Sequence, residues 1–252
     1  MSQSKIVTAA LIIIGNEILS GRTRDANLQF LGEELNELGI RIAECRIIPD
    51  VESIIIETLN FCRESYNYVF TTGGIGPTHD DITAVAIAKA FETNLERHPE
   101  AEAMLLERYK PEDVTEARMK MADIPVGASL LKNPVSIAPG FRLENVFVMA
   151  GVPRIMQSMF KEYSHELTGG QPVLSGSITS YLPEGLIGMS LGEIQDKFPD
   201  VDIGSYPFWN DGKPGTNLVV RHTEVEVVNA ACDEIVQMVN NLGGKPVDDK
   251  RP

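Results

Sequence analysis

The sequence is poor in positive charge. Its 252 residues hold 22 Lys and Arg against 36 Asp and Glu, which gives a formal net charge of -14 at pH 7. No run of Lys or Arg provides the basic patch with which proteins release counterions from nucleic acid or bind anionic membranes. We therefore expect neither a nucleic acid nor a membrane as a partner.

Cysteine is also scarce. Cys45, Cys62 and Cys232 are odd in number and widely spaced, so they form neither a disulfide framework nor a CxxC metal site. This usage is typical of a reducing compartment, and we expect a cytoplasmic protein.

Long apolar runs are missing. No stretch approaches the roughly 18 apolar residues of a membrane span. The apolar stretch at 6–14 meets Gly15-Asn16-Glu17 instead of the small-residue cleavage site of a signal peptide. Its β-branched residues predict a buried strand.

What is present is an alternation of strands and helices. Strands are predicted at 6–14, 40–48, 68–72 and 145–151, and helices at 25–38, about 54–62, 80–91 and 153–167. A charged helical insertion occupies about 98–122. This order predicts an α/β fold, a mainly parallel sheet covered by helices on both faces.

A domain boundary is predicted near Gly169-Gly170 and Pro172, which end the last of these helices. We expect one domain at 1–168 and a small α+β module at 169–252. The final residues, 245–252, have the composition of a frayed tail.

The stretch TTGGIGPTHDD at 71–81 lies at the carboxyl end of a predicted strand and ahead of a helix. Gly73, Gly74 and Gly76 would let peptide N–H groups crowd onto a phosphate, with Thr78 beside them. Alternatively, Thr78 is the N-cap of the helix and Asp81 completes a pair like a capping box. Capping leaves Asp80 unexplained, since two acids repel an anion unless a cation lies between them.

Better-known motifs do not fit. The sequence contains neither GxxxxGK[ST] nor GxGxxG, which argues against P-loop and dinucleotide-dehydrogenase interpretations. Residues 188–192 fit GxSxG, but we interpret Ser190 and Glu193 as a capping box, because the preceding apolar run is too short for the strand of a nucleophile elbow.

Four motifs, GNEILSG, TTGGIGPTHDDIT, NPVSIAPGF and AGVPRIM, follow one another over residues 6–160. In this order they resemble the molybdopterin-binding (MoaB/Mog-like) fold family, which includes the amino-terminal domain of CinA proteins. DIGSYPFW and NLVVRHTE are similar to the molybdopterin-binding-like domain of eukaryotic FAD synthase. The deamidase domain of CinA proteins and an FAD-synthesising domain find no counterpart in these residues, so we expect neither activity from them.

The resemblance implies a metal-dependent pyrophosphatase that hydrolyses a dinucleotide-like substrate such as ADP-ribose or FAD and releases AMP. It implies a divalent cation (cobalt, magnesium or manganese), with potassium as an activator. Asp81 and Asp50 match acids of the family and become candidate catalytic residues, with Asp80 and Asp81 as candidate metal ligands. From the local sequence alone, Asp50 fits an N-cap equally well.

Further candidate substrate-binding residues lie in two other loops. Asn16, Glu17, Ser20 and Asn27 border the crevice expected at the first strand-to-helix crossing. Ser136 and Gly140 lie in a Pro-rich loop that either approaches a ligand or merely connects two elements.

Two other functions stay open. The protein could bind molybdopterin or serve cofactor biosynthesis without hydrolysis, or it could sense an ADP-ribose-type nucleotide and pass the signal through an oligomer interface. We expect a small-molecule partner, a dinucleotide or a pterin, and a homo-oligomer.

Overall fold

The computed structural model describes residues 6–252. They form two compact units that divide between Gly170 and Gln171. The predicted boundary lies between residues 168 and 169. Within the described part, no helix combines the length and the apolar character needed to cross a membrane.

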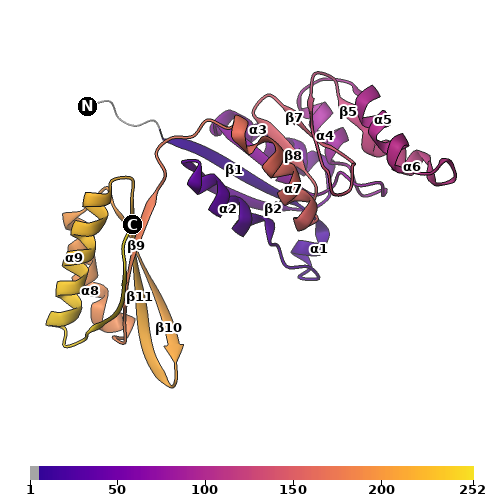
Figure 1. Ribbon diagram of the computed structural model, residues 1–252. Coiled ribbons are helices and arrows are strands. Elements are labelled where there is room, and N and C mark those ends of the chain that lie inside the picture. The colour runs from indigo at the N-terminus through magenta and orange to yellow at the C-terminus, as the bar shows by residue number, and fades with distance from the viewer. Residues whose placement is uncertain (1–5) are drawn as a thin grey trace. The chain divides into compact units, whose positions relative to one another are not determined.

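The first unit is built on a six-stranded sheet (Figure 1). The strands lie in the order β2 (Ile40–Ile48), β1 (Val7–Ile14), β3 (Tyr68–Thr72), β8 (Val146–Met149), β7 (Gly140–Leu143) and β6 (Ser129–Leu131). The first four run parallel, and β7 and β6 are antiparallel to their neighbours. The predicted mainly parallel sheet is confirmed.

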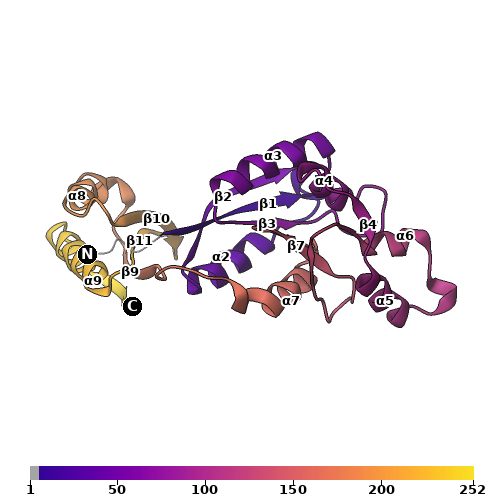
Figure 2. The same ribbon diagram turned by 90° about the horizontal axis from the view of Figure 1, so that it is seen from above.

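Helices cover both faces of this sheet, as Figure 2 shows. One face carries α2 (Asn27–Glu37) and α7 (Pro153–Tyr163), and the other carries α3 (Glu52–Ser65) and α4 (Thr83–Ala90). Because strand residues alternate between faces, β1 contributes to two cores. Ala10, Ile12 and Ile14 pack into one of them. Leu11 and Ile13 pack into the other.

The charged insertion forms a small group of helices and strands beside the main sheet. It contains β4 (Leu95–Arg97), α5 (Pro99–Arg108), α6 (Glu116–Met119), the 3-10 turns Pro111–Asp113 and Lys120–Ala122, and β5 (Asp123–Pro125), which pairs antiparallel with β4. Buried residues such as Ala101, Leu105 and Ile124 join it to the core on the α3/α4 face.

The second unit has the order β9 (Leu174–Ser180), α8 (Glu184–Lys197), β10 (Asp202–Asn210), β11 (Lys213–His222), α9 (Val225–Asn241) and β12 (Pro246–Lys250). Its sheet has the order β10-β11-β9-β12. This is the split βαβ arrangement of ferredoxin-like folds. The predicted small α+β module is confirmed.

Two predictions for this unit are wrong. Residues 246–250 are not a frayed tail but strand β12, paired with β9 and followed by Arg251, which bonds Asp249 and Asp233. Ser190 is not an N-cap, because α8 already begins at Glu184 and Ser190 lies inside it. That interior position also removes the nucleophile-elbow interpretation, which needs a strand-to-helix turn.

Candidate active site at the carboxyl edge of the sheet

Four loops meet at the carboxyl edge of the parallel strands, where ligands of open α/β sheets bind. The Asn16 N–H, after β1, donates to Asp50 Oδ2, after β2, at 2.8 Å. The Asn27 Nδ2 donates to the Gly151 carbonyl, after β8, at 2.9 Å. The Gly73 N–H, after β3, donates to the Met149 carbonyl at 3.0 Å. The four loops therefore hold one another in place.

The turn after β3 requires glycine at two positions. Gly73 and Gly74 have φ of 106° and 69°, a region that L side chains rarely adopt. A Cβ on Gly73 would lie 2.1 Å from the Ile14 carbonyl oxygen, and one on Gly74 would lie 2.2 Å from Thr83 Oγ1. Any side chain here would push the turn away from β1 or α4.

Thr83, the first residue of α4, fixes this turn. Its buried hydroxyl donates to the Gly73 carbonyl at 3.0 Å, and its N–H donates to the Gly74 carbonyl at 3.0 Å. The N–H groups of Gly74, Ile75 and Gly76 donate to no acceptor among the described residues. Consecutive free N–H groups in a turn with positive φ form an anion-binding concavity.

The capping interpretation of Thr78 is wrong. Helix α4 begins at Thr83 with Ile82 as its N-cap, so residues 78–81 precede it. Asp81 Oδ2 instead accepts hydrogen bonds from the Thr78 N–H at 2.8 Å and from the Thr78 hydroxyl. This carboxylate also lies against Gly76, where an added Cβ would come within 2.7 Å of Oδ2. Its other oxygen, Oδ1, accepts no hydrogen bond from the described residues.

His79 and Asp80 lie at the exposed tip of the turn. The neighbouring side chains of Thr78, His79 and Lys120 hold the pKa of the Asp80 carboxyl below its ordinary value, so Asp80 is ionised at neutral pH. Within residues 6–252, no three His, Cys, Asp or Glu side chains are grouped so as to hold a metal. The donors present, Asp80 and Asp81 Oδ1, fit a cation such as Mg²⁺ that takes one or two carboxylates and completes its shell with phosphates and water.

Lys120 is a site residue that the sequence analysis missed. Its ammonium group donates to the Thr78 carbonyl at 2.9 Å and to the Asp81 carbonyl at 2.7 Å. Sequence offered no signal, because Lys120 belongs to the insertion, about 40 residues further along the chain.

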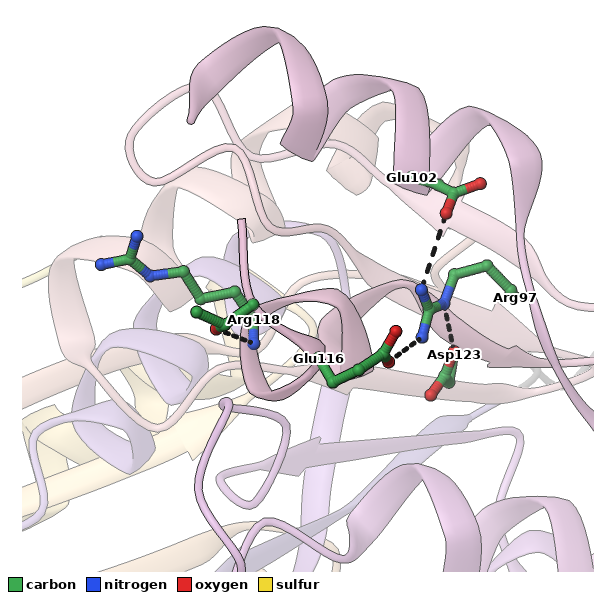
Figure 3. Close-up of polar contacts among 6 residues, drawn as sticks. Arg97, Glu102, Glu116, Arg118 and Asp123 are labelled. Atoms are coloured by element: carbon green, nitrogen blue, oxygen red, sulfur yellow. Dashed lines mark hydrogen bonds and ion pairs between the residues drawn. The ribbon is translucent and has the colours of Figure 1, made fainter. Parts of the chain in front are cut away.

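The insertion that carries Lys120 is held by ion pairs, drawn in Figure 3. Arg97 contacts Asp123 at 2.6 Å, Glu116 at 3.3 Å and Glu102 at 3.6 Å. Asp123 follows the turn Lys120–Ala122 directly, and Glu116 begins α6 just before it. This cluster therefore fixes the segment from which Lys120 contacts residues 78–81, which we call the acidic turn.

Asp50 is not a helix cap either, because the N-cap of α3 is Val51. Asp50 Oδ2 accepts a hydrogen bond from the Asn16 N–H, and this bond joins the loops after β1 and β2. Asn16, Glu17 and Ser20 are exposed in and after α1 (Asn16–Leu19), and the Ser20 hydroxyl donates to the Glu17 carbonyl. Asn27, by contrast, is buried at the start of α2.

Ser136 lies in the loop before β7, at the same edge of the sheet, since β7 runs antiparallel to β8. The Asn133 side chain organises this loop and donates from Nδ2 to the Ser136 hydroxyl and to the Ala138 carbonyl. Gly140 is buried at the start of β7 itself. Within the described residues, no hydrogen bond joins Ser136 or Gly140 to the acidic turn.

Comparison with known proteins identifies the fold family. Residues 10–169 match the family described as a probable molybdopterin binding domain. The chain belongs to this family. Residues 172–244 match a second family, the middle domain of FAD synthase.

Two curated relatives match most of the chain, and a solved structure matches about two thirds of it. A protein of Archaeoglobus fulgidus is 32% identical over 92% of this chain and 97% of its own length. A probable FAD synthase of Caenorhabditis briggsae is 32% identical over 91% of this chain, which spans 49% of that relative. Among solved structures, the CinA protein of Thermoplasma acidophilum matches with a TM-score of 0.60 and 33% identity, covering 63% of this chain and 96% of its own.

Proposed function

We propose that this protein is a pyrophosphatase that uses a divalent cation to hydrolyse a dinucleotide-like substrate such as ADP-ribose or FAD, releasing AMP. The similarity to FAD synthase supports a flavin or adenine dinucleotide as the ligand class. We do not propose the activity of the full-length FAD synthase for this chain, because the chain spans only 49% of that relative.

One observation carries the proposal. Three free N–H groups at Gly74, Ile75 and Gly76 form a seat for a phosphate, and the carboxylates of Asp80 and Asp81 follow within five residues. A binder of anions alone would gain from a Lys or Arg directed at the phosphate, whereas the ammonium group of Lys120 donates to the carbonyls of Thr78 and Asp81. Two acidic side chains beside a phosphate instead make binding depend on a cation.

The residues of the chain would divide the work. The glycine N–H groups hold the phosphate, and Thr78 and Lys120 orient Asp81 so that Oδ1 stays free. Asp50 holds the loop after β1 against the same edge. When bound between the acids and the phosphate, a divalent cation would polarise the phosphoryl oxygens and stabilise the charge that develops in the transition state.

A second candidate function is the binding of molybdopterin without hydrolysis. It is supported by the description of the matching family. The phosphate seat serves this function as well, since a pterin cofactor with a phosphate group would present the same anion. Binding of molybdopterin without hydrolysis gives no role to Asp80 and Asp81.

The test is a hydrolysis screen. Purified protein is incubated with ADP-ribose, FAD, NAD or CoA and with magnesium, manganese or cobalt, with and without potassium, and the release of AMP is measured. We expect AMP from ADP-ribose or FAD in the presence of a divalent cation. Asp81→Asn should lower turnover about 100-fold or more, because it removes the charge of a metal ligand, while the amide oxygen still accepts from Thr78.

The matched control is Asp113→Asn, which makes the same chemical change at an acid paired with Arg118 in the insertion. It should leave turnover unchanged. Full activity of Asp81→Asn would reduce Asp81 to a turn-forming residue. The absence of hydrolysis under all conditions, together with pterin binding, would favour the second candidate function.

A further inference from the structure

The free edge of β2 differs from the other edges of the two larger sheets. Among the described residues, β2 pairs with β1 alone and lies at one end of its sheet. The other edge strands have features with which natural proteins prevent edge-to-edge pairing. β6 has three residues, β10 contains Pro207, and β12 contains Pro246, two Asp and one Lys. β2 has nine residues and neither Pro nor Lys.

A β-bulge limits the regular part of this edge to its second half. Ala9 pairs with Ile42 and Ala10 pairs with Glu44, so Ala43 is an extra residue of β2. From Glu44 to Ile48, the pairing with β1 is continuous. A strand that adds to this edge in regular register would therefore be centred within residues 44–48.

This regular part carries one negative and one positive charge on the same face of the sheet. Arg46 Nε donates to Glu44 Oε1 at 2.7 Å, and the Tyr66 hydroxyl donates to Glu44 Oε2 at 2.7 Å. The bonds from Arg46 and Tyr66 lower the pKa of the Glu44 carboxyl, so Glu44 is ionised at neutral pH. The two charges are thus fixed at positions two residues apart along the strand.

Exposed apolar side chains flank the edge on both faces of the sheet. Phe61 of α3 is 49% exposed, and its ring centroid lies 4.3 Å from the Arg46 guanidinium. Ile47 is 44% exposed on the opposite face, since its partner Ile13 packs into the core beneath α2 and α7. Apolar side chains next to an edge strand that can still pair are typical of a protein interface.

The charges select one arrangement for a second copy of the chain. A two-fold axis perpendicular to the sheet pairs β2 antiparallel with β2, and directly opposite residues then share a face. An axis at residue 44 would oppose two Glu44 side chains, and an axis at residue 46 would oppose two Arg46 side chains. An axis at Cys45 places Glu44 of each copy opposite Arg46 of the other. Unlike charges in this position stabilise an antiparallel pair, and like charges destabilise it.

We infer that β2 is the interface of a homodimer, in which two sheets join edge to edge with β2 antiparallel to β2 about a two-fold axis at Cys45. The four charges of Glu44 and Arg46 then alternate in sign along and across the two strands. The contact is specific for a second copy, because it requires the same two residues in reversed order. It does not depend on the proposed function.

The experiment measures the Kd of the dimer by sedimentation equilibrium for the wild type, Glu44→Arg and Arg46→Glu. Each variant alone places like charges opposite each other, so we expect its Kd to rise about 10-fold. A one-to-one mixture of the two variants restores unlike charges at both positions, and we expect a mixed dimer with a Kd within about threefold of the wild type. Mixing cannot repair the contact between Glu44 and Arg46 within one chain, so this rescue reports pairing between copies.

A second pair of variants decides the matter if charge reversal disturbs the fold. Ile47→Lys introduces the residue with which natural edge strands prevent pairing. Leu106→Lys makes the same change at a side chain of α5 that is 48% exposed. We expect Ile47→Lys to be monomeric at concentrations where the wild type and Leu106→Lys are dimeric.

A wild type that does not form dimers would overturn the inference. So would folded charge variants whose mixture stays monomeric, or an unchanged Kd in Glu44→Arg, Arg46→Glu and Ile47→Lys, which would place the dimer contact elsewhere. None of these results bears on hydrolysis, which the AMP-release screen measures by itself.

Discussion

Lys120 shows how single residues outside the acidic turn determine its shape. Its ammonium group donates to the carbonyls of Thr78 and Asp81, the two residues whose side chains bond each other. It also lies close enough to Asp80 to favour the ionised carboxylate. The turn thus depends on one lysine to hold its backbone and to balance part of its charge.

We predict that Lys120→Met weakens both the fold of the first unit and its affinity for a nucleotide. The loss of two hydrogen bonds from a charged donor should lower the free energy of unfolding by about 1–3 kcal/mol. Urea unfolding and calorimetric titration with AMP and magnesium measure the two effects. Lys110→Met, at an exposed lysine of the same insertion, is the control. If the two variants behave alike, Lys120 does not hold the turn.

Some of these residues could be predicted from the sequence and others could not. Gly73 and Gly74 were predictable, because Gly-Gly at the end of a strand indicates backbone that other residues cannot adopt. The capping alternative for Thr78 and Asp81 was wrong, since the pattern of a capping box also fits a turn that precedes the helix. Lys120 could not be predicted, because its contact depends on how a distant insertion folds back.

At the scale of elements, the alternation of β-branched strands and apolar helices was sufficient to predict the four parallel strands of the first unit and the helices that cover them, but not the short antiparallel strands β6 and β7. Strands β1, β2 and β3 follow the predicted ranges within a residue. Strand β12 was not predicted, because the composition of PVDDK is typical of solvent-exposed chain without regular structure. It lies at the edge of its sheet, where four of its five residues are exposed and pairing rather than burial holds it.

Arg251 is the anchor of β12. Its guanidinium contacts Asp249 at 2.8 Å, Asp233 of α9 at 2.9 Å and the Asn229 carbonyl at 3.1 Å. The hydrogen bond with Asp249 is the largest of the effects that raise the pKa of Arg251, so it stays charged. These contacts fasten the end of the chain to the last helix.

We predict that Arg251→Met lowers the free energy of unfolding of the second unit by about 1 kcal/mol, the upper range for exposed ion pairs. Deletion of residues 246–252 should lower it further, because β9 then loses a paired strand. Trp209, the single tryptophan, lies in β10 and reports this unit by fluorescence during urea unfolding. Lys245→Met is the control. An unchanged midpoint in both altered chains would mean that β12 contributes nothing.

At the scale of the whole molecule, the excess of Asp and Glu over Lys and Arg affects how the protein binds a phosphate ligand. With a net charge of -14, the protein repels phosphate ligands at long range. Carboxylates beside a bound phosphate add a short-range repulsion between like charges. A divalent cation between carboxylate and phosphate would turn this repulsion into attraction. The fold family could be predicted from the sequence, because four motifs occur in the family's order. The ligand could not be predicted, because the same motifs fit several different ligands that carry a phosphate.

The central claim is that a cation and a nucleotide bind this edge together. The most direct measurement is a calorimetric titration of a methylene-bridged ADP-ribose, which cannot be hydrolysed, in EDTA and in excess magnesium or cobalt. We expect affinity at least about 100-fold higher with the cation and, because linkage is reciprocal, an equal gain in cation affinity when the nucleotide is present. Equal nucleotide affinity in EDTA and in excess cation would contradict the account.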